Sequence, residues 1–186
     1  GTEDLDKEIR AELQRVDDAL SMFNKQSTLS KFNRNEAFDV NDSRFNDVVR
    51  LSQQLSQETD GAFDISVAPL VNEWGFGFKH REEVTQAKVD SLRQFVGYDK
   101  LYYEKNKLCK RDPRVTIDCG AVAKGYGVDC VAKLLSANGC TNYMVEIGGE
   151  VVVKGQNAKG KKWTIGINKP VDDSTKTVSE VQTVLH

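Results

Sequence analysis

Six apolar residues near the N-terminus recur at steps of 4, 4, 3, 4 and 3 positions; they are Leu5, Ile9, Leu13, Val16, Leu20 and Phe23. This spacing places them along one side of an α-helix, because residues three and four apart are neighbours on its surface. The positions between them are mostly charged or polar. We therefore expect an amphipathic helix over residues 3–24 that covers a core with one side.

The rest of the chain mixes helical and strand patterns, and no internal repeat is visible. Helices are expected from residues 41–43, which offer good N-caps, to the turn at Asp60-Gly61, and over 89–96 and 121–137. Hairpins are expected at 101–103 with 108–109 and at 143–147 with 150–153, and further strands at 115–118, 163–167 and 178–185. Helices mixed with antiparallel hairpins indicate the α+β class.

Length and composition are those of one soluble globular domain. The chain has 186 residues, of which 39% are apolar and 29% charged, and its formal net charge is −2. We expect no nucleic-acid partner, because no basic excess is present. No apolar run approaches the roughly 18 residues that a membrane-spanning helix needs, and the first residues do not read as a signal peptide.

The four cysteines lie at intervals of 10, 11 and 10 residues, at positions 109, 119, 130 and 140. Zinc sites commonly draw two ligands from a spacing of two to four residues, which does not occur here. A domain of this size does not need disulfides for stability. We expect mostly buried thiols.

A first candidate site covers residues 59–64 (TDGAFD) and 69–77 (PLVNEWGFG). Two glycines around a Trp-Phe pair suit a surface that lets a planar ring or a phosphate approach the backbone. We expect a strand after Asp60-Gly61, with Ala62, Asp64 and Ser66 on one side of it and Phe63, Ile65 and Val67 on the other. A hairpin followed by an aromatic surface loop, without a ligand, is the alternative.

A second candidate site is the junction at residues 118–127, where Asp118 ends a strand and a glycine-containing turn opens a helix. Such a junction presents unpaired N–H groups and the positive end of a helix dipole, which suit an anion. Lys124, expected in the first helical turn, runs against the dipole unless it meets a phosphate. The alternative is a small-residue helix that packs closely on a sheet.

Together these segments resemble the ApbE family of flavin transferases. Further matching motifs are 23–33 (FNKQSTLSKFN), 118–126 (DCGAVAKGY), 145–150 (VEIGGE) and 163–170 (WTIGINKP), all in the family's order and over nearly the whole chain. The resemblance implies an ApbE-like α+β domain of mixed, largely antiparallel sheets packed with helices. It also implies an enzyme that binds FAD and Mg²⁺, transfers FMN to a Ser or Thr hydroxyl of an acceptor flavoprotein, and releases AMP.

The resemblance also assigns site residues. It implies contacts to FAD from Phe23, Ala62, Phe63, Asp64, Asp118 and Lys124, and a magnesium ligand at the backbone carbonyl of Ala121. Phe23 stands where the family commonly has a tyrosine, so the stacking face is kept and the hydroxyl is lost. Structural alternatives are core packing for Phe23, helix capping for Asp118 and a solvated side chain for Lys124; Trp74 and Trp163 are expected to pack rather than to bind.

The chain also departs from the family pattern. The family's first strand and its later motifs, a Ser-Gly, a His-Ile-Asp-Pro and an Asp and Thr that complete the metal site, do not occur among the 186 residues. We therefore expect a single ApbE-like domain, incomplete at both ends, and little or no activity from this chain alone. The resemblance implies a periplasmic, lipid-anchored protein. Other functions considered are an FAD pyrophosphatase, a non-catalytic flavin-binding protein and an interaction domain without flavin.

Overall fold

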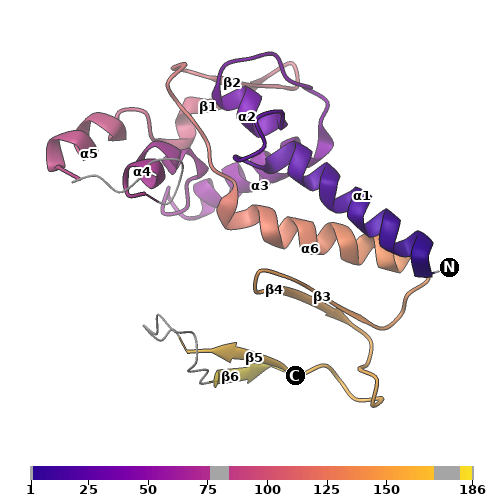
Figure 1. Ribbon diagram of the computed structural model, residues 1–186. Coiled ribbons are helices and arrows are strands. Elements are labelled where there is room, and N and C mark those ends of the chain that lie inside the picture. The colour runs from indigo at the N-terminus through magenta and orange to yellow at the C-terminus, as the bar shows by residue number, and fades with distance from the viewer. Residues whose placement is uncertain (1, 76–83, 170–180, 186) are drawn as a thin grey trace. The chain divides into compact units, whose positions relative to one another are not determined.

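The computed structural model describes residues 2–75, 84–169 and 181–185, which form helices and three two-stranded antiparallel sheets (Figure 1). In chain order the elements are α1 (Thr2–Leu20), α2 (Thr28–Asn33), α3 (Ser43–Glu58), η1 (Ile65–Val67), α4 (Ala68–Glu73), α5 (Gln86–Arg93), η2 (Tyr98–Lys100), β1 (Leu101–Glu104), β2 (Lys107–Lys110), α6 (Gly120–Ala137), β3 (Tyr143–Ile147), β4 (Glu150–Lys154), β5 (Ile165–Asn168) and β6 (Val181–Leu185). The expected α+β class is confirmed. The chain divides into two compact units, Gly1–Gly127 and Val128–His186.

In the first unit, α1 packs against α2 and α3. Val16 and Leu20 are buried, as the apolar stripe predicts, whereas Leu13 of the stripe is 37% exposed and Ala19, outside the stripe, is buried. The helix ends at Leu20 rather than near residue 24, so Phe23 does not continue the stripe; its side chain is 68% exposed. The alternative that Phe23 packs in the core is therefore wrong.

The short helix α2 lies in a stretch that the sequence indicated only as a break between helices. The Ser27 side chain caps it by accepting a hydrogen bond from the Ser30 N–H. Leu29 and Phe32 are buried at 0% and 3% exposure. Six residues are too few for a periodic apolar stripe to stand out, so burial in the tertiary structure stabilises this helix.

An aromatic cluster forms the core between α2 and α3. The rings of Phe32, Phe38 and Phe45 lie with their centroids 5.7 to 5.8 Å apart in tilted or edge-to-face geometry. Phe45 is fully buried. Asp42 caps α3 as predicted, since its side chain accepts from the Phe45 N–H. The position of α2 therefore depends on the start of α3.

Residues 115–118, expected as a strand, pair with no strand in the described part of the chain. Val115 and Ile117 are fully buried. The Asn33 side chain accepts from the Ile117 N–H and donates to the Ile117 carbonyl, both at 2.8 Å. A side-chain amide thus takes the place of a neighbouring strand, which a strand pattern in the sequence cannot reveal.

The hairpins agree with the sequence. β1 pairs with β2, and β3 pairs with β4 around Gly148 and Gly149, both at positive φ. The strand β5 begins two residues later than expected and pairs antiparallel with β6, which falls inside the expected range 178–185; residues 178–180 of that range lie outside the described residues. None of the described helices combines the length and the apolar character that crossing a membrane requires.

The cysteines differ from the expectation. Only Cys119 is buried, and Cys109, Cys130 and Cys140 are partly exposed. Cys109 follows the buried Leu108 in β2, so strand alternation turns its side chain to the other side of the hairpin. Burial raises the pKa of the Cys119 thiol to about 12, which leaves it protonated and unreactive at neutral pH.

An ion cluster between α1 and α3 predicts a pH effect on stability. Arg44 and Arg15 hydrogen-bond the two oxygens of Glu12, whose side chain is 11% exposed. Burial alone would raise the pKa of Glu12, but the hydrogen bonds and charges of both arginines outweigh it and lower the pKa. The stabilisation is therefore present above the unfolded-state pKa and is lost as pH falls through the folded-state pKa.

We expect Glu12→Gln to lower the free energy of unfolding by about 1–2 kcal/mol at pH 7. The difference from the wild type should shrink as pH falls from the ordinary glutamate range through the lowered folded-state pKa of Glu12. Urea unfolding between pH 3 and 7 measures it. Asp6→Asn, which breaks an exposed pair with Arg10, is the control and should leave stability unchanged. A Glu12→Gln effect that is the same at pH 3 and pH 7 would contradict the assignment to the charge.

Candidate functional site

The first candidate segment follows the end of α3. The Gly61 N–H donates to the Ser56 carbonyl at 2.8 Å, and Gly61 has a φ of +80°. A side chain there would also come within 3.2 Å of the Tyr98 ring, so glycine suits both the turn and the close approach. The predicted turn is confirmed. It brings Ala62 out to an exposed position and leaves Phe63 half-buried.

The strand expected over residues 62–67 is wrong. The Asp64 side chain accepts from the Ser66 N–H at 2.8 Å and starts the 3-10 helix η1, which leads directly into α4. A short carboxylate that bonds the backbone two residues on bends the chain, and this local bond competes with extended structure. Pro69 then lies in the first turn of α4, where its missing N–H has no cost. Ile65 and Ser66 are both buried, so they do not alternate in and out.

The second candidate segment opens α6. The Asp118 side chain accepts from the Gly120 N–H at 2.7 Å, as helix capping predicts. Val122 and Ala123 both direct their N–H groups to the Cys119 carbonyl. Within the described residues the Ala121 N–H donates no hydrogen bond, so it is open to an anion.

Lys124 is the fifth residue of α6, so it stands just beyond the first turn in which it was expected. Its side chain is exposed. Ala121, the second residue of the helix, is exposed too. Both positions are accessible to a ligand at the start of α6.

One backbone hydrogen bond joins the two segments. The Asp118 N–H donates to the Ile65 carbonyl at 2.8 Å. Asp118 therefore lies beside the residue that follows Asp64, although 54 positions separate the two aspartates in the sequence. The structure brings together the start of η1 and the start of α6, the two segments that sequence analysis selected.

Phe23 lines a separate cavity of about 550 Å³ together with Ser30, Asn33 and residues of the following loop. Asn33 also holds Ile117, the residue before Asp118. Sequence reasoning missed Asn33 as a site residue. The only available signal was its place as the last residue of the motif at 23–33.

Comparison with known proteins places these features in one family. The sequence profile of the ApbE family matches residues 2–186. The chain belongs to the ApbE family. Curated ApbE relatives named FAD:protein FMN transferase include those of Vibrio cholerae, 41% identical over 182 residues, and Haemophilus influenzae, 39% identical over 184 residues. These matches cover 95% and 94% of this chain.

Solved ApbE structures show the same fold. The flavin transferase ApbE from Vibrio cholerae superposes with a TM-score of 0.87 at 39% identity, over 99% of this chain and 60% of that one. The apo form of the Pseudomonas stutzeri flavinyl transferase ApbE gives 0.83 at 30% identity, over 97% and 57%. The chain spans about half the length of the curated relatives it matches, 54% and 53% for those two.

The donor set for the magnesium ion that the ApbE resemblance implies is incomplete here. Among residues 2–75, 84–169 and 181–185 no cluster of three His, Cys, Asp or Glu side chains could hold a metal ion. The Ala121 carbonyl is one oxygen, and Mg²⁺ takes octahedral oxygen coordination. These residues do not make a metal site by themselves.

The two tryptophans of this ApbE chain differ from each other. Trp74, just after α4, is 39% exposed, so its side chain is covered only in part. Trp163 is half-buried, and its indole N–H donates to the Lys154 carbonyl at 3.0 Å. The residues 76–83 that follow Trp74, including the rest of the aromatic loop, lie outside the described residues.

Proposed function

We propose that the protein containing this chain is an Mg²⁺-dependent FAD:protein FMN transferase. A Ser or Thr hydroxyl of an acceptor flavoprotein attacks the FMN phosphorus of FAD and loses its proton. The bond from that phosphorus to the bridging oxygen breaks, and AMP leaves with that oxygen. Family membership and the names of the curated relatives support this proposal. The structural observation that carries it is the hydrogen bond from the Asp118 N–H to the Ile65 carbonyl, because it joins the two segments assigned to FAD.

Each segment has a part in the proposed binding mode. The exposed Phe23 ring offers a flat apolar face to the isoalloxazine. Ala62, Phe63 and Asp64 line the cofactor from the η1 side. Asp118 contacts FAD from the start of α6, where the open Ala121 N–H and the Lys124 ammonium meet its phosphates.

Magnesium, when bound, would supply charge stabilisation for phosphoryl transfer. Because the described residues do not complete a metal site, we propose that this chain by itself transfers little or no FMN. We also propose a periplasmic, lipid-anchored location for the whole protein, on the family resemblance alone.

The test is to incubate the full protein with FAD, Mg²⁺ and an acceptor flavoprotein. Transfer predicts FMN attached to a Ser or Thr peptide, found by mass spectrometry, with AMP released in equal amount. FMN and AMP in solution without a modified acceptor would indicate a pyrophosphatase instead. FAD that stays bound and intact would indicate a flavin-binding protein without catalysis.

Asp118→Ala is expected to weaken FAD binding about tenfold or more, because a hydrogen bond to a charged group contributes roughly 1.5–3 kcal/mol. Titration of flavin fluorescence measures the affinity. Asp39→Ala is the matched control, since Asp39 also accepts from the N–H two residues ahead, that of Asn41 at 2.9 Å. Equal FAD affinities of the two variants would show that Asp118 only caps α6.

A further inference from the structure

Asn33 makes an unusual pair of hydrogen bonds with the backbone of one buried residue. Its amide Nδ2 donates to the Ile117 carbonyl and its Oδ1 accepts from the Ile117 N–H, each at 2.8 Å. Ile117 has no exposed surface. The pair satisfies the backbone N–H and the carbonyl of a buried residue, so the energetic cost of losing it is high.

The next residue along the chain is Asp118. Its N–H donates to the Ile65 carbonyl at 2.8 Å. Asn33 and Ile65 therefore hold two consecutive residues, and the position of the Asp118 carboxylate depends on both. Without the bonds from Asn33, residues 115–117, which pair with no described strand, would lose the hydrogen bonds that hold them next to Asp118.

Asn33 is itself firmly placed. It is the last residue of α2, and its carbonyl accepts from the Lys110 Nζ at 3.2 Å. It also lines the cavity of Phe23. One side chain thus connects the cavity of the exposed aromatic ring with the backbone that carries Asp118.

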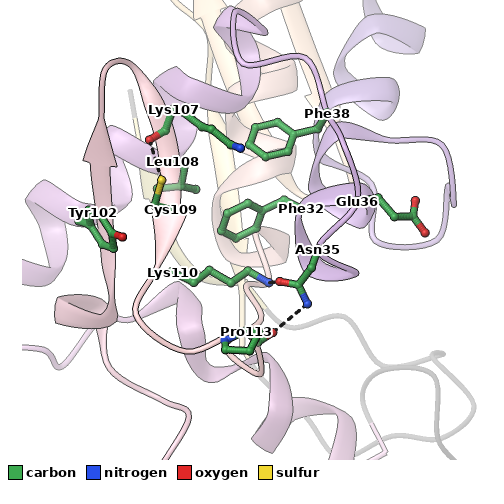
Figure 2. A pocket seen from close by; sticks show the side chains of 10 residues that line it. All are labelled: Phe32, Asn35, Glu36, Phe38, Tyr102, Lys107, Leu108, Cys109, Lys110 and Pro113. Carbon is green, nitrogen blue, oxygen red and sulfur yellow. Dashed lines mark hydrogen bonds between the residues drawn. The ribbon is translucent and has the colours of Figure 1, made fainter.

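Asn35 contacts the same connecting segment at Pro113 (Figure 2). Its Nδ2 donates to the Pro113 carbonyl at 3.0 Å, and its Oδ1 accepts from the Lys110 Nζ at 3.1 Å. This arrangement supplies a matched control, because an equivalent side-chain amide bonds the same segment five residues before Asp118.

We propose that Asn33 is a positioning residue for FAD binding, which fixes the Asp118 carboxylate relative to the Phe23 cavity through its double hydrogen bond to Ile117. This inference rests on the proposed function. It assigns Asn33 no direct role in the transfer step.

The chemistry of the amide suggests a specific test. In Asn33→Asp a protonated carboxyl group can still donate to the Ile117 carbonyl and accept from its N–H, whereas an ionised carboxylate only accepts and repels that carbonyl. The charged groups around this position are Lys110 of β2, Asp118, and Lys25, Arg34 and Glu36 beside the cavity. Asn33→Gln keeps the amide but moves it by one methylene group, so the geometry of the two hydrogen bonds to Ile117 is lost at every pH.

FAD affinity is measured by flavin fluorescence in the full protein at pH 8 and pH 5, with thermal unfolding of each variant recorded alongside. We expect Asn33→Asp to bind FAD at least tenfold more weakly than the wild type at pH 8, and within about threefold of it at pH 5. Asn33→Gln should be weak at both pH values. Asn35→Asp should stay within about threefold of the wild type throughout.

A second readout needs no FAD. Amide hydrogen exchange of Asp118, measured by NMR, should be at least tenfold faster in Asn33→Gln than in the wild type and unchanged in Asn35→Asp. A purely structural role would instead destabilise both Asn33→Gln and Asn35→Asp, and the exchange rate of the Asp118 amide would not rise in Asn33→Gln alone.

If the wild type binds FAD and both Asn33→Asp and Asn33→Gln bind it as tightly as the wild type at pH 8, the positioning role is overturned and the proposed function stays intact. Equal losses in Asn33→Asp and Asn35→Asp would overturn it as well. A wild type that does not bind FAD would overturn both proposals together. If Asn33→Asp does not fold at pH 8, the FAD affinity of the folded Asn33→Gln protein decides.

Discussion

Phe45→Ala is expected to lower the free energy of unfolding of the first unit by about 3–5 kcal/mol, the usual cost of removing a buried phenylalanine ring. Phe45 is fully buried and contacts both Phe32 and Phe38. Its loss leaves a cavity against α2, the helix that carries Asn33. Urea unfolding followed by circular dichroism measures the change.

Phe23→Ala is the matched control, because it removes the same ring from a position that is 68% exposed. We expect a change of about 0.5 kcal/mol or less in stability. Under the proposed function this variant loses FAD affinity instead. A Phe45→Ala protein destabilised by less than about 1 kcal/mol would contradict the location of the core between α2 and α3.

Gly155→Ala is expected to destabilise the second unit by about 2–5 kcal/mol. Gly155 has a φ of +67°. An L-residue that carries a side chain is destabilised in this left-handed backbone conformation. A methyl group would also overlap the Thr141 carbonyl oxygen and the Asn142 Oδ1. The Asn142 Oδ1 accepts from the Gln156 N–H at 2.7 Å, so moving it away breaks a hydrogen bond.

Gly160→Ala separates the two contributions to this effect. Gly160 has nearly the same φ, +70°, but nothing lies within 4 Å of an added methyl group. Gly160→Ala should lower the free energy of unfolding only through the unfavourable φ, by about 1–2 kcal/mol. Thermal unfolding followed by the fluorescence of Trp163, which contacts Lys154, compares the variants. Equal effects would show that the overlap at Gly155 relaxes without cost.

Local signals predicted those elements that are long or tightly turned. The helix α3 has a capping residue, Asp42, and a positive-φ turn after its end at Asp60-Gly61, both visible in the sequence. The hairpin of β3 and β4 has Gly-Gly at its turn. In these segments the backbone preferences of neighbouring residues agree with the final fold, so reading them locally is sufficient.

The errors arose where a side chain distant in sequence or a short polar residue takes over a backbone bond. Asp64 bends residues that alternate like a strand, through its bond to the Ser66 N–H. Ile117 resembles a strand residue but pairs with Asn33, which lies 84 positions away. A pattern of apolar residues indicates which positions are buried. It does not indicate which group accepts the hydrogen bond of a buried N–H.

The sequence by itself determined the α+β class, the ApbE resemblance and the two segments that carry Asp64 and Asp118. Tertiary structure alone decided that these segments meet, through the bond from Asp118 to Ile65, and that Asn33 holds the residue beside them. The physical reason is that turns and caps depend on adjacent residues, whereas partners for buried backbone groups are chosen when distant segments pack.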